Sequence, residues 1–189
     1  MTSDLSTADD RRGRIVAAAI AAFSCFGYRR CAMADIAAAA GMSRPALYLV
    51  FSGKEAVLRA VAAQLLADAA ANAEAAWPPE SPVAAGLAAA ILAKDLAIHR
   101  LIMASPHAAE ILAVATDLAG DLHATSAARY QALLASRLRV AGHRDPDETA
   151  RMIVHASTGL KHAGLPEADY IADVHRLALL LAVPMPADN

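Results

Sequence analysis

The sequence predicts an all-α protein, with a three-helix helix-turn-helix domain over residues 1–53 and a larger helical domain over residues 54–189. Hydrophobic residues make up 57% of the chain but aromatic residues only 4%. Much of the apolar content is therefore alanine, which favours helix. Apolar residues also recur at helical spacing in long stretches that glycine and proline separate. Almost no segment has the alternating pattern of a β-strand.

A first helix is predicted upstream of Gly27, which ends it. Its apolar residues recur every three or four positions and define one buried face: Ile15, Ala18, Ala19, Ala22, Phe23 and Phe26. Cys25 is expected on the same apolar side, as a small core residue. We therefore expect this helix to form the base on which the next two helices pack.

Residues 34–54 predict two short helices joined by a tight turn. Gly41 can adopt the positive φ that ends the first of them. Ser43 can cap the second, and Pro45 lies in its first turn, where no amide donor is needed. The apolar positions expected to hold the pair together are Ile36, Ala37, Leu47 and Phe51. This arrangement is a helix-turn-helix.

Turn signals divide the remaining residues into further helices. Ser52 and Glu55 form a capping box that opens a long helix, predicted to run to about Ala76 and followed by a proline-rich loop over residues 77–82. The next helix begins near Val83, and the pattern leaves open whether it breaks near Ala93 or continues to Met103. A new helix is expected after residues 105–106. Gly120 interrupts or kinks the chain, a long helix is predicted from about Asp121 to Ala141, and Gly142 ends it.

The last two predicted helices are amphipathic and run over residues 146–162 and 167–183. Asp145 is expected to cap the first of them, with Pro146 in its first turn. Together the two helices carry more apolar surface than one neighbour can cover. We therefore expect them to pair with their copies in a homodimer, whose two-fold axis also suits two DNA half-sites.

Charge is distributed unevenly along a chain whose net charge is −2. Residues 1–60 hold eight basic and five acidic residues, a balance of +3, whereas the remainder holds nine basic and fourteen acidic residues. A basic first part suits contact with phosphates, although ordinary scatter in charge also accounts for it. Two interpretations of Arg29 and Arg30 stay open, since they either approach a DNA backbone or form a solvated corner.

The second helix of the motif presents residue types suited to a DNA major groove. An Arg side chain can bind guanine edges, an Ala methyl can contact thymine and a Tyr hydroxyl can reach a phosphate. The outward-facing candidates here are Arg44, Ala46 and Tyr48. Their position at the N-terminus of a recognition helix predicts double-stranded DNA as a partner.

The motif resembles the signature of the TetR (tetracycline repressor) family. The matching residues are Gly27, Tyr28, Asp35, Ile36, Ala37, Ala40, Gly41, Met42, Ser43, Leu47, Tyr48, Phe51, Lys54 and Glu55. The resemblance covers about residues 15–61. Two positions depart from it, because Cys31 and Ala32 replace the usual Ser or Thr before the first motif helix, and Val50 stands where His is common.

This resemblance implies a dimeric DNA-binding regulator without a cofactor. It implies that Lys54 contacts a phosphate, which a neighbouring helix N-terminus would favour. It also implies that the two last helices build the dimer interface. The complete set of candidate DNA-binding residues is Ser43, Arg44, Pro45, Ala46, Tyr48 and Lys54.

Histidines of the second domain suggest an effector pocket of apolar character with polar anchors. The candidate ligand-binding residues are His99, Met103, His107, His123, Tyr130, Met152 and His155. The alternative is that each histidine lies on the surface or is satisfied separately. A transition-metal sensor would use the same residues, but clustered cysteines and close histidine spacing are absent, so no metal site is predicted.

Sequence motifs for catalysis are missing. The chain has no phosphate-binding glycine loop, no nucleophile elbow and no zinc-binding helix motif. None of the six glutamates is followed three residues later by His, which argues against a di-iron bundle. An enzyme is therefore not expected.

The two cysteines, Cys25 and Cys31, provide no disulfide framework. No stretch has the pattern of a signal peptide or of a membrane span, so we expect a cytoplasmic protein. The favoured interpretation is a ligand-responsive regulator, a repressor that binds a palindromic operator as a dimer and is released by a small molecule. The alternative is a helical small-molecule-binding protein without operator binding.

Overall fold

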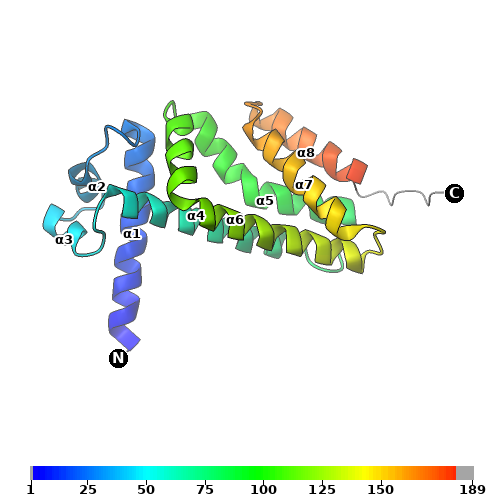
Figure 1. The fold of residues 1–189 in the computed structure, drawn as a ribbon, viewed down its shortest axis with the longest axis horizontal. Coiled ribbons are helices and arrows are strands. Elements are labelled where there is room, and N and C mark those ends of the chain that lie inside the picture. Colours follow the sequence, from blue (N-terminus) through cyan, green and yellow to red (C-terminus); the bar gives the residue numbers. More distant parts are fainter. Residues whose placement is uncertain (1, 182–189) are drawn as a thin grey trace. The chain divides into compact units, whose positions relative to one another are not determined.

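The structure is a computed structural model that describes residues 2–181, with side chains described from residue 10 onward. All regular structure in this part of the chain is helical (Figure 1). The helices are α1 Thr2–Phe26, α2 Met33–Ala39, α3 Arg44–Tyr48, α4 Lys54–Ala76, α5 Val83–Ala104, α6 Ala108–Val140, α7 Pro146–His162 and α8 Glu167–Leu181. The predicted all-α fold is confirmed.

The helices form two compact units. The first unit comprises Met1–Leu65 and Leu101–His123, and the second comprises Leu66–Arg100 and Ala124–Asn189. Helices α4, α5 and α6 each contribute residues to both units. The sequence predicts a different division, after residue 53, between a DNA-binding domain and an effector-binding domain. That functional division stays a prediction.

The core of the first unit joins α1, α2, α3 and the start of α4. Its most buried side chains include Ile15, Phe23, Ile36, Ala37, Leu47, Phe51, Val57 and Leu58. The four apolar residues predicted to hold the helix-turn-helix together are all among the buried residues. Hydrophobic burial therefore fixes α3 against α2 and against the rest of the first unit.

Two predictions about α1 are wrong. Cys25 is exposed, and Phe26 has 47% of its surface exposed. Cys25 follows the buried Phe23 by two positions, which places it about 200° around the helix axis, on the opposite face. Phe26 lies in the last helical position, immediately before the buried Gly27, which turns the chain away. The free thiol of Cys31 is buried instead.

The core of the second unit is built by α4–α8. Its largest fully buried side chains include Trp77, Tyr130 and Tyr170, with Leu87, Ile91, Leu134 and Leu138. Trp77 belongs to the segment predicted only as a proline-rich loop. In the structure its indole covers Gly86 of α5, and a Cβ on that glycine would lie 2.2 Å from Trp77 Cδ1. The loop is therefore fixed to the core by one aromatic side chain.

Several helix ends follow the sequence signals. Helix α5 continues without a break to Ala104. Helix α6 is kinked at Ala119, which has φ −132° and ψ 26° and immediately precedes the predicted interruption at Gly120. Gly142 ends α6 with φ +76°. The predicted cap at Asp145 is wrong, because its side chain makes no capping hydrogen bond.

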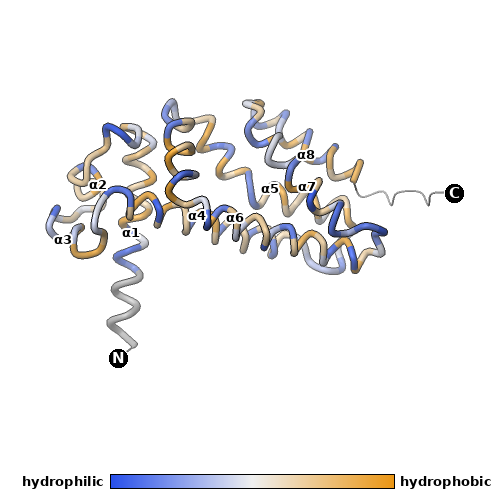
Figure 2. The backbone as a smooth tube through the Cα atoms, viewed as in Figure 1, coloured by the Kyte–Doolittle hydropathy of each residue, from blue (hydrophilic) through white to orange (hydrophobic). Residues whose placement is uncertain are grey.

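The predicted end of the last helix, near residue 183, lies outside the described residues. Within them, none of the helices is long and apolar enough to cross a membrane. Figure 2, in which the backbone is coloured by hydropathy, shows that hydrophilic residues are interspersed among hydrophobic ones along the helices.

We predict that Gly86→Ala lowers the free energy of unfolding. The added methyl group would overlap the Trp77 ring, and overpacking of this kind costs about 1–3 kcal/mol. Gly159→Ala in α7 is the matched control, because nothing lies within 4 Å of its Cβ position. That control should gain up to about 1 kcal/mol from helix propensity. Urea unfolding followed by circular dichroism measures the free energy of unfolding of both variants. An equal increase in Gly86→Ala and Gly159→Ala would contradict the tight Trp77 contact.

Candidate nucleic-acid interface and effector site

The turn between α2 and α3 is fixed by backbone geometry. Gly41 has φ +64°, and the amide of Met42 donates to the carbonyl of Ala37 at 2.9 Å, which closes the end of α2. Ser43 Oγ then accepts a hydrogen bond from the Ala46 amide at 3.3 Å. The predicted roles of Gly41 as the turn residue and of Ser43 as the cap of α3 are therefore confirmed. Helix α3 begins at Arg44, the first side chain of the candidate reading surface.

Arg44 and Tyr48 both lie exposed on α3, one turn apart. The Arg44 Cζ atom is 5.6 Å from the centre of the Tyr48 ring, and Tyr48 is 43% exposed. Ala46 is only half-buried, whereas Leu47 is buried in the core. Leu49, which the sequence reasoning missed, is 86% exposed directly after α3. Helix α3 and the residue after it thus present a cation, an aromatic ring and an apolar side chain to solvent.

Helix α2 begins without a capping hydroxyl, as the sequence indicated at Ala32. The carboxylate of Asp35 replaces part of that function, because its Oδ2 accepts a hydrogen bond from the Ala32 amide at 2.8 Å. This is one half of a capping box. The departure at Ala32 therefore leaves the local fold of α2 intact and removes only a hydroxyl.

The Lys54 ammonium group lies at the start of α4 and faces the chain between α1 and α2. Its Nζ donates to the carbonyl oxygens of Tyr28, Arg29 and Cys31 at 2.7, 3.2 and 2.9 Å. It also lies 4.5 Å from the centre of the Tyr28 ring. An ammonium group has three donors, so these carbonyls occupy its hydrogen-bonding capacity. In this conformation Lys54 fixes the α1–α2 connection, and its predicted phosphate contact stays a prediction.

The first half of α6 contacts the same connection within the first unit. The Arg29 amide donates to Glu110 Oε1 at 2.7 Å. Ser105 Oγ, just before α6, donates to the carbonyl of Ser24 at 3.0 Å. The Arg29 side chain itself stays 86% exposed. The start of α6 therefore holds the chain that leads into α2.

Helix α6 is also tied to α4 through Arg59. The Arg59 guanidinium donates to the Leu118 carbonyl at 2.6 Å and to both carboxylate oxygens of Asp121 at 2.8 and 2.6 Å. These hydrogen bonds from Arg59 lower the pKa of Asp121 to about 2. The kink of α6 at Ala119 brings the Leu118 carbonyl and the Asp121 carboxylate to the same guanidinium. Two charge-assisted hydrogen bonds in parallel fix the orientation of the pair.

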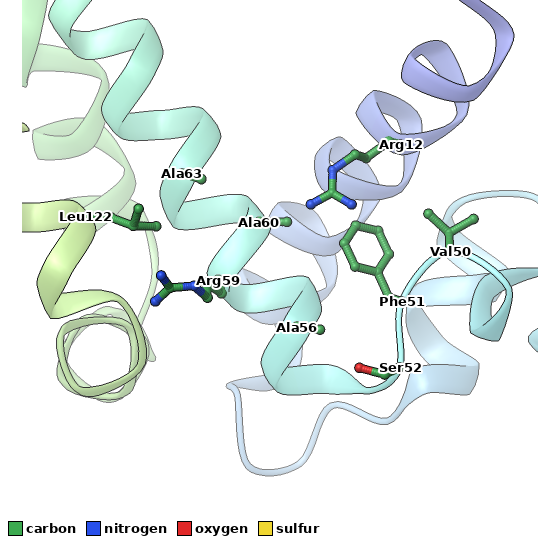
Figure 3. A pocket seen from close by; sticks show the side chains of 9 residues that line it. All are labelled: Arg12, Val50, Phe51, Ser52, Ala56, Arg59, Ala60, Ala63 and Leu122. Carbon is green, nitrogen blue, oxygen red and sulfur yellow. The ribbon is translucent and has the colours of Figure 1, made fainter. Parts of the chain in front are cut away.

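Beside this ion pair lies an open hollow of about 590 Å³ within the first unit. Figure 3 shows Arg12 of α1 above the Phe51 ring on one side of the hollow and Arg59 with Leu122 on the other. The Arg12 Cζ atom is 4.6 Å from the centre of the Phe51 ring. Alanines of α4 form the floor between them. The hollow is not one of the sites that the sequence predicted.

The predicted effector residues fall in both units. Met103, His107 and His123 belong to the first unit, and the other four belong to the second. Met152 is 52% exposed and His155 is also exposed. His99 and Tyr130 are buried in the second unit. Sequence spacing could not reveal this division, because the candidates come from α5, from α6 and the residue before it, and from α7.

His99 and Tyr130 belong to a buried polar cluster that also contains residues missed by the sequence reasoning. Asp95, 1% exposed, accepts hydrogen bonds at one oxygen, Oδ1, from Lys94 and from Lys161, each at 2.9 Å. The Lys94 Nζ atom lies 4.8 Å from the centre of the Tyr130 ring. The His99 ring stacks on Tyr170, with ring centres 4.3 Å apart. The sequence signal for this cluster was the spacing of Asp95 and His99, because residues four apart lie on the same face of a helix.

Comparison with known proteins agrees with this geometry. Residues 15–61 match the model of bacterial regulatory proteins of the tetR family. No curated protein matches the chain significantly. Among solved structures, a transcriptional regulator from Rhodococcus sp. Rha1 has a TM-score of 0.74 at 17% identity, over 90% of this chain and 95% of that one.

Two further solved structures have the same fold. A tetR-family transcriptional regulator from Streptomyces coelicolor has a TM-score of 0.70 at 19% identity, over 92% of this chain and 80% of that one. The fatty acid degradation regulator FadR from Bacillus halodurans has a TM-score of 0.68 at 20% identity, over 89% and 94%. At such identities the likeness establishes the fold.

The helix-turn-helix lies within the part of the chain that the family model matches. Residues 15–61 match the model of this family, and the chain as a whole has the fold of the solved transcriptional regulators. The resemblance seen in the sequence is confirmed. The matched family consists of regulatory proteins, which agrees with the expectation that the chain is not an enzyme. Among the described residues, no three or more His, Cys, Asp or Glu side chains form a group that could hold a metal ion.

We predict that the contribution of the Arg59–Asp121 pair to stability is lost in acid. The folded-state pKa of Asp121 lies below its usual value of 3.8, so the pair stabilises the native state above that value. Its contribution falls as the pH drops from about 4 to about 2, where half of the Asp121 carboxylates of the folded protein are protonated. Wild type should therefore exceed Asp121→Asn in melting temperature at pH 7 but not near pH 2. Asp173→Asn, which removes the exposed carboxylate that Arg176 contacts on α8, is the control and should change the melting temperature little at either pH. A difference between wild type and Asp121→Asn that does not change with pH would contradict this account.

Proposed function

We propose that the protein is a repressor that binds a palindromic operator as a homodimer and releases it when a small molecule binds the second unit. The observation that carries the proposal is the exposed pair Arg44 and Tyr48 on α3, the second helix of the helix-turn-helix. Such a regulator would act in the cytoplasm, where the chromosomal DNA of bacteria lies.

The reading surface would consist of α3 and the residues on either side of it. Arg44 would contact base edges, Tyr48 a phosphate, and Ser43, Pro45 and Ala46 would approach the DNA at the start of α3. Leu49 is added to this set because its exposed apolar side chain suits contact with a thymine methyl or a sugar. Lys54 would act in two ways, by fixing the α1–α2 connection and by adding positive charge near the phosphates.

The homodimer would form through α7 and α8. These helices carry large apolar side chains that are exposed in the single chain: Met152 at 52%, Leu179 at 63% and Leu180 at 70%. Burying such side chains favours association. A two-fold interface would also present two recognition helices to two half-sites, about 34–36 Å apart.

Effector release would follow from linkage between the two units. A ligand weakens DNA binding only by its differential affinity for a conformation that binds DNA poorly. Helix α6 offers a physical route, because its second half lies in the second unit and its first half contacts the α1–α2 connection and α4 in the first. A shift of α6 would thus change the support of the helix-turn-helix.

We predict that Arg44→Ala relaxes the base preference of DNA binding. A bidentate contact of Arg with a base contributes about 1–3 kcal/mol of discrimination. The preference for operator over scrambled DNA should therefore fall by about tenfold or more. Fluorescence anisotropy with DNA flanking the gene of this protein, at two salt concentrations, measures this.

Two further variants define the outcome of this experiment. Arg129→Ala removes the same charge in the second unit, where the side chain pairs with Glu74, and should leave the preference unchanged. Lys54→Met should weaken binding to all DNA sequences and also lower the melting temperature, because it removes three hydrogen bonds. If wild type binds both DNAs equally weakly, the protein is a helical ligand-binding protein without operator binding.

We predict that Leu180→Glu converts the dimer to a monomer. A carboxylate placed in an apolar interface would be desolvated without a partner, so association should weaken by about 100-fold or more. Val140→Glu is the matched control, because Val140 is 69% exposed at the end of α6, outside α7 and α8. Analytical ultracentrifugation gives the oligomeric state. An unchanged dimer in Leu180→Glu would place the interface elsewhere.

A further inference from the structure

The buried polar cluster of the second unit contains several groups that the described residues leave without a hydrogen-bond partner. These groups are Asp95 Oδ2, both ring nitrogens of His99, and the hydroxyl groups of Tyr130 and Tyr170. All four side chains are at most 2% exposed. Leaving a buried polar group unpaired costs free energy, so a concentration of five such atoms in one core requires an explanation.

The unpaired groups come from three helices of one unit. Asp95 and His99 lie on α5, Tyr130 on α6 and Tyr170 on α8. The His99 and Tyr170 rings are stacked, and Lys94 connects Asp95 with the face of the Tyr130 ring. The unpaired groups therefore converge from different elements, which distinguishes them from isolated packing defects.

The charges of the cluster favour an anion. Two ammonium groups, of Lys94 and Lys161, share a single carboxylate, that of Asp95. Their side chains are only 16% and 15% exposed, so water screens the excess positive charge poorly. A cationic ligand would meet two ammonium groups, whereas an anionic ligand would restore neutrality. A ligand charge of −1 is the one that balances the lysines.

The donors point to the same ligand chemistry. Burial, and secondarily the charge of Asp95, raises the pKa of both Tyr130 and Tyr170, so their hydroxyl groups keep their protons and can donate. His99 offers a further ring N–H. Two hydroxyl donors and two ammonium groups suit the two oxygens of a carboxylate, and the stacked rings of His99 and Tyr170 provide an aromatic surface for a planar body.

We propose that the Asp95–His99–Tyr130–Tyr170 cluster, with Lys94 and Lys161, is the binding site for a small organic carboxylate. The carboxylate accepts hydrogen bonds from the tyrosine hydroxyls and lies against the two ammonium groups. This inference rests on the proposed function only in that the carboxylate then acts as the effector that releases DNA. The binding itself is independent of DNA and is tested without it.

Binding is measured by isothermal titration calorimetry on the full chain, without DNA, with benzoate, acetate and octanoate as probes. Benzamide is the matched neutral control for benzoate, and benzylamine is the cationic one. The fluorescence of Trp77, the single tryptophan of the chain, gives a second readout because it lies in the same core. We expect at least one carboxylate to bind, with benzamide and benzylamine at least about tenfold weaker.

Variants locate the site. Lys161→Met keeps the aliphatic stem and should weaken carboxylate binding by about tenfold or more, and Tyr170→Phe should also weaken it. Arg129→Met, which removes an exposed charge of the same unit, should have no effect. Circular dichroism melts establish that each variant is folded. Tyr130→Phe serves as the second hydroxyl variant if Tyr170→Phe does not fold.

The outcomes separate the two proposals. If no carboxylate binds, if benzamide binds as well as benzoate, or if the folded variants bind like wild type, the carboxylate site is wrong and the cluster is a structural polar network. If a carboxylate binds as expected but operator anisotropy is unchanged by it, the site stands and effector release is wrong. If DNA fails to bind at all while the carboxylate binds, the repressor proposal fails and the site remains.

Discussion

The ammonium group of Lys54 is the contact on which the geometry of the reading surface depends. It binds three carbonyl oxygens of the chain between α1 and α2 from the first turn of α4. A backbone that has left α1 and not yet entered α2 has carbonyl groups without helical partners, and these must be satisfied elsewhere. Lys54 satisfies three of them at once, so it joins the segment before the motif to the helix after it.

Support from the first half of α6 adds a second constraint. The Glu110 carboxylate accepts a hydrogen bond from the Arg29 amide, next to the carbonyl groups that Lys54 binds. Arg59 of α4 donates hydrogen bonds to the kinked segment of α6. The kink at Ala119 matters because it brings one carbonyl and one carboxylate to the same guanidinium. Helix α6, which contributes residues to both compact units, therefore contacts with its first half the segments that orient the helix-turn-helix.

The second unit combines apolar packing with a charged centre. Trp77, Leu87, Ile91 and Leu134 form an ordinary hydrophobic core, which stabilises the unit by burial. Near it, one carboxylate faces two lysines, and several donors are left without protein partners. A core designed only for stability would avoid this arrangement, since unpaired buried polar groups are costly. The cost is consistent with a site kept for binding.

Local signals in the sequence determined the helices, the turn at Gly41, the cap at Ser43 and the apolar positions of the motif, since all of these depend on neighbours within a few residues. The resemblance to a regulatory family came from the same short stretch. The prediction that Cys25 and Phe26 are buried was wrong, because Cys25 lies on the face of α1 opposite Phe23 and Phe26 is the last helical residue before Gly27 turns the chain.

Tertiary structure alone decided which distant side chains meet. It separated the seven candidate effector residues between two units, and it brought Lys161 to Asp95, 66 positions away along the chain. It also turned Trp77 from a loop residue into a core anchor, and it directed Lys54 to backbone carbonyls. Helical periodicity defines a face on each helix, but only packing selects which faces oppose each other.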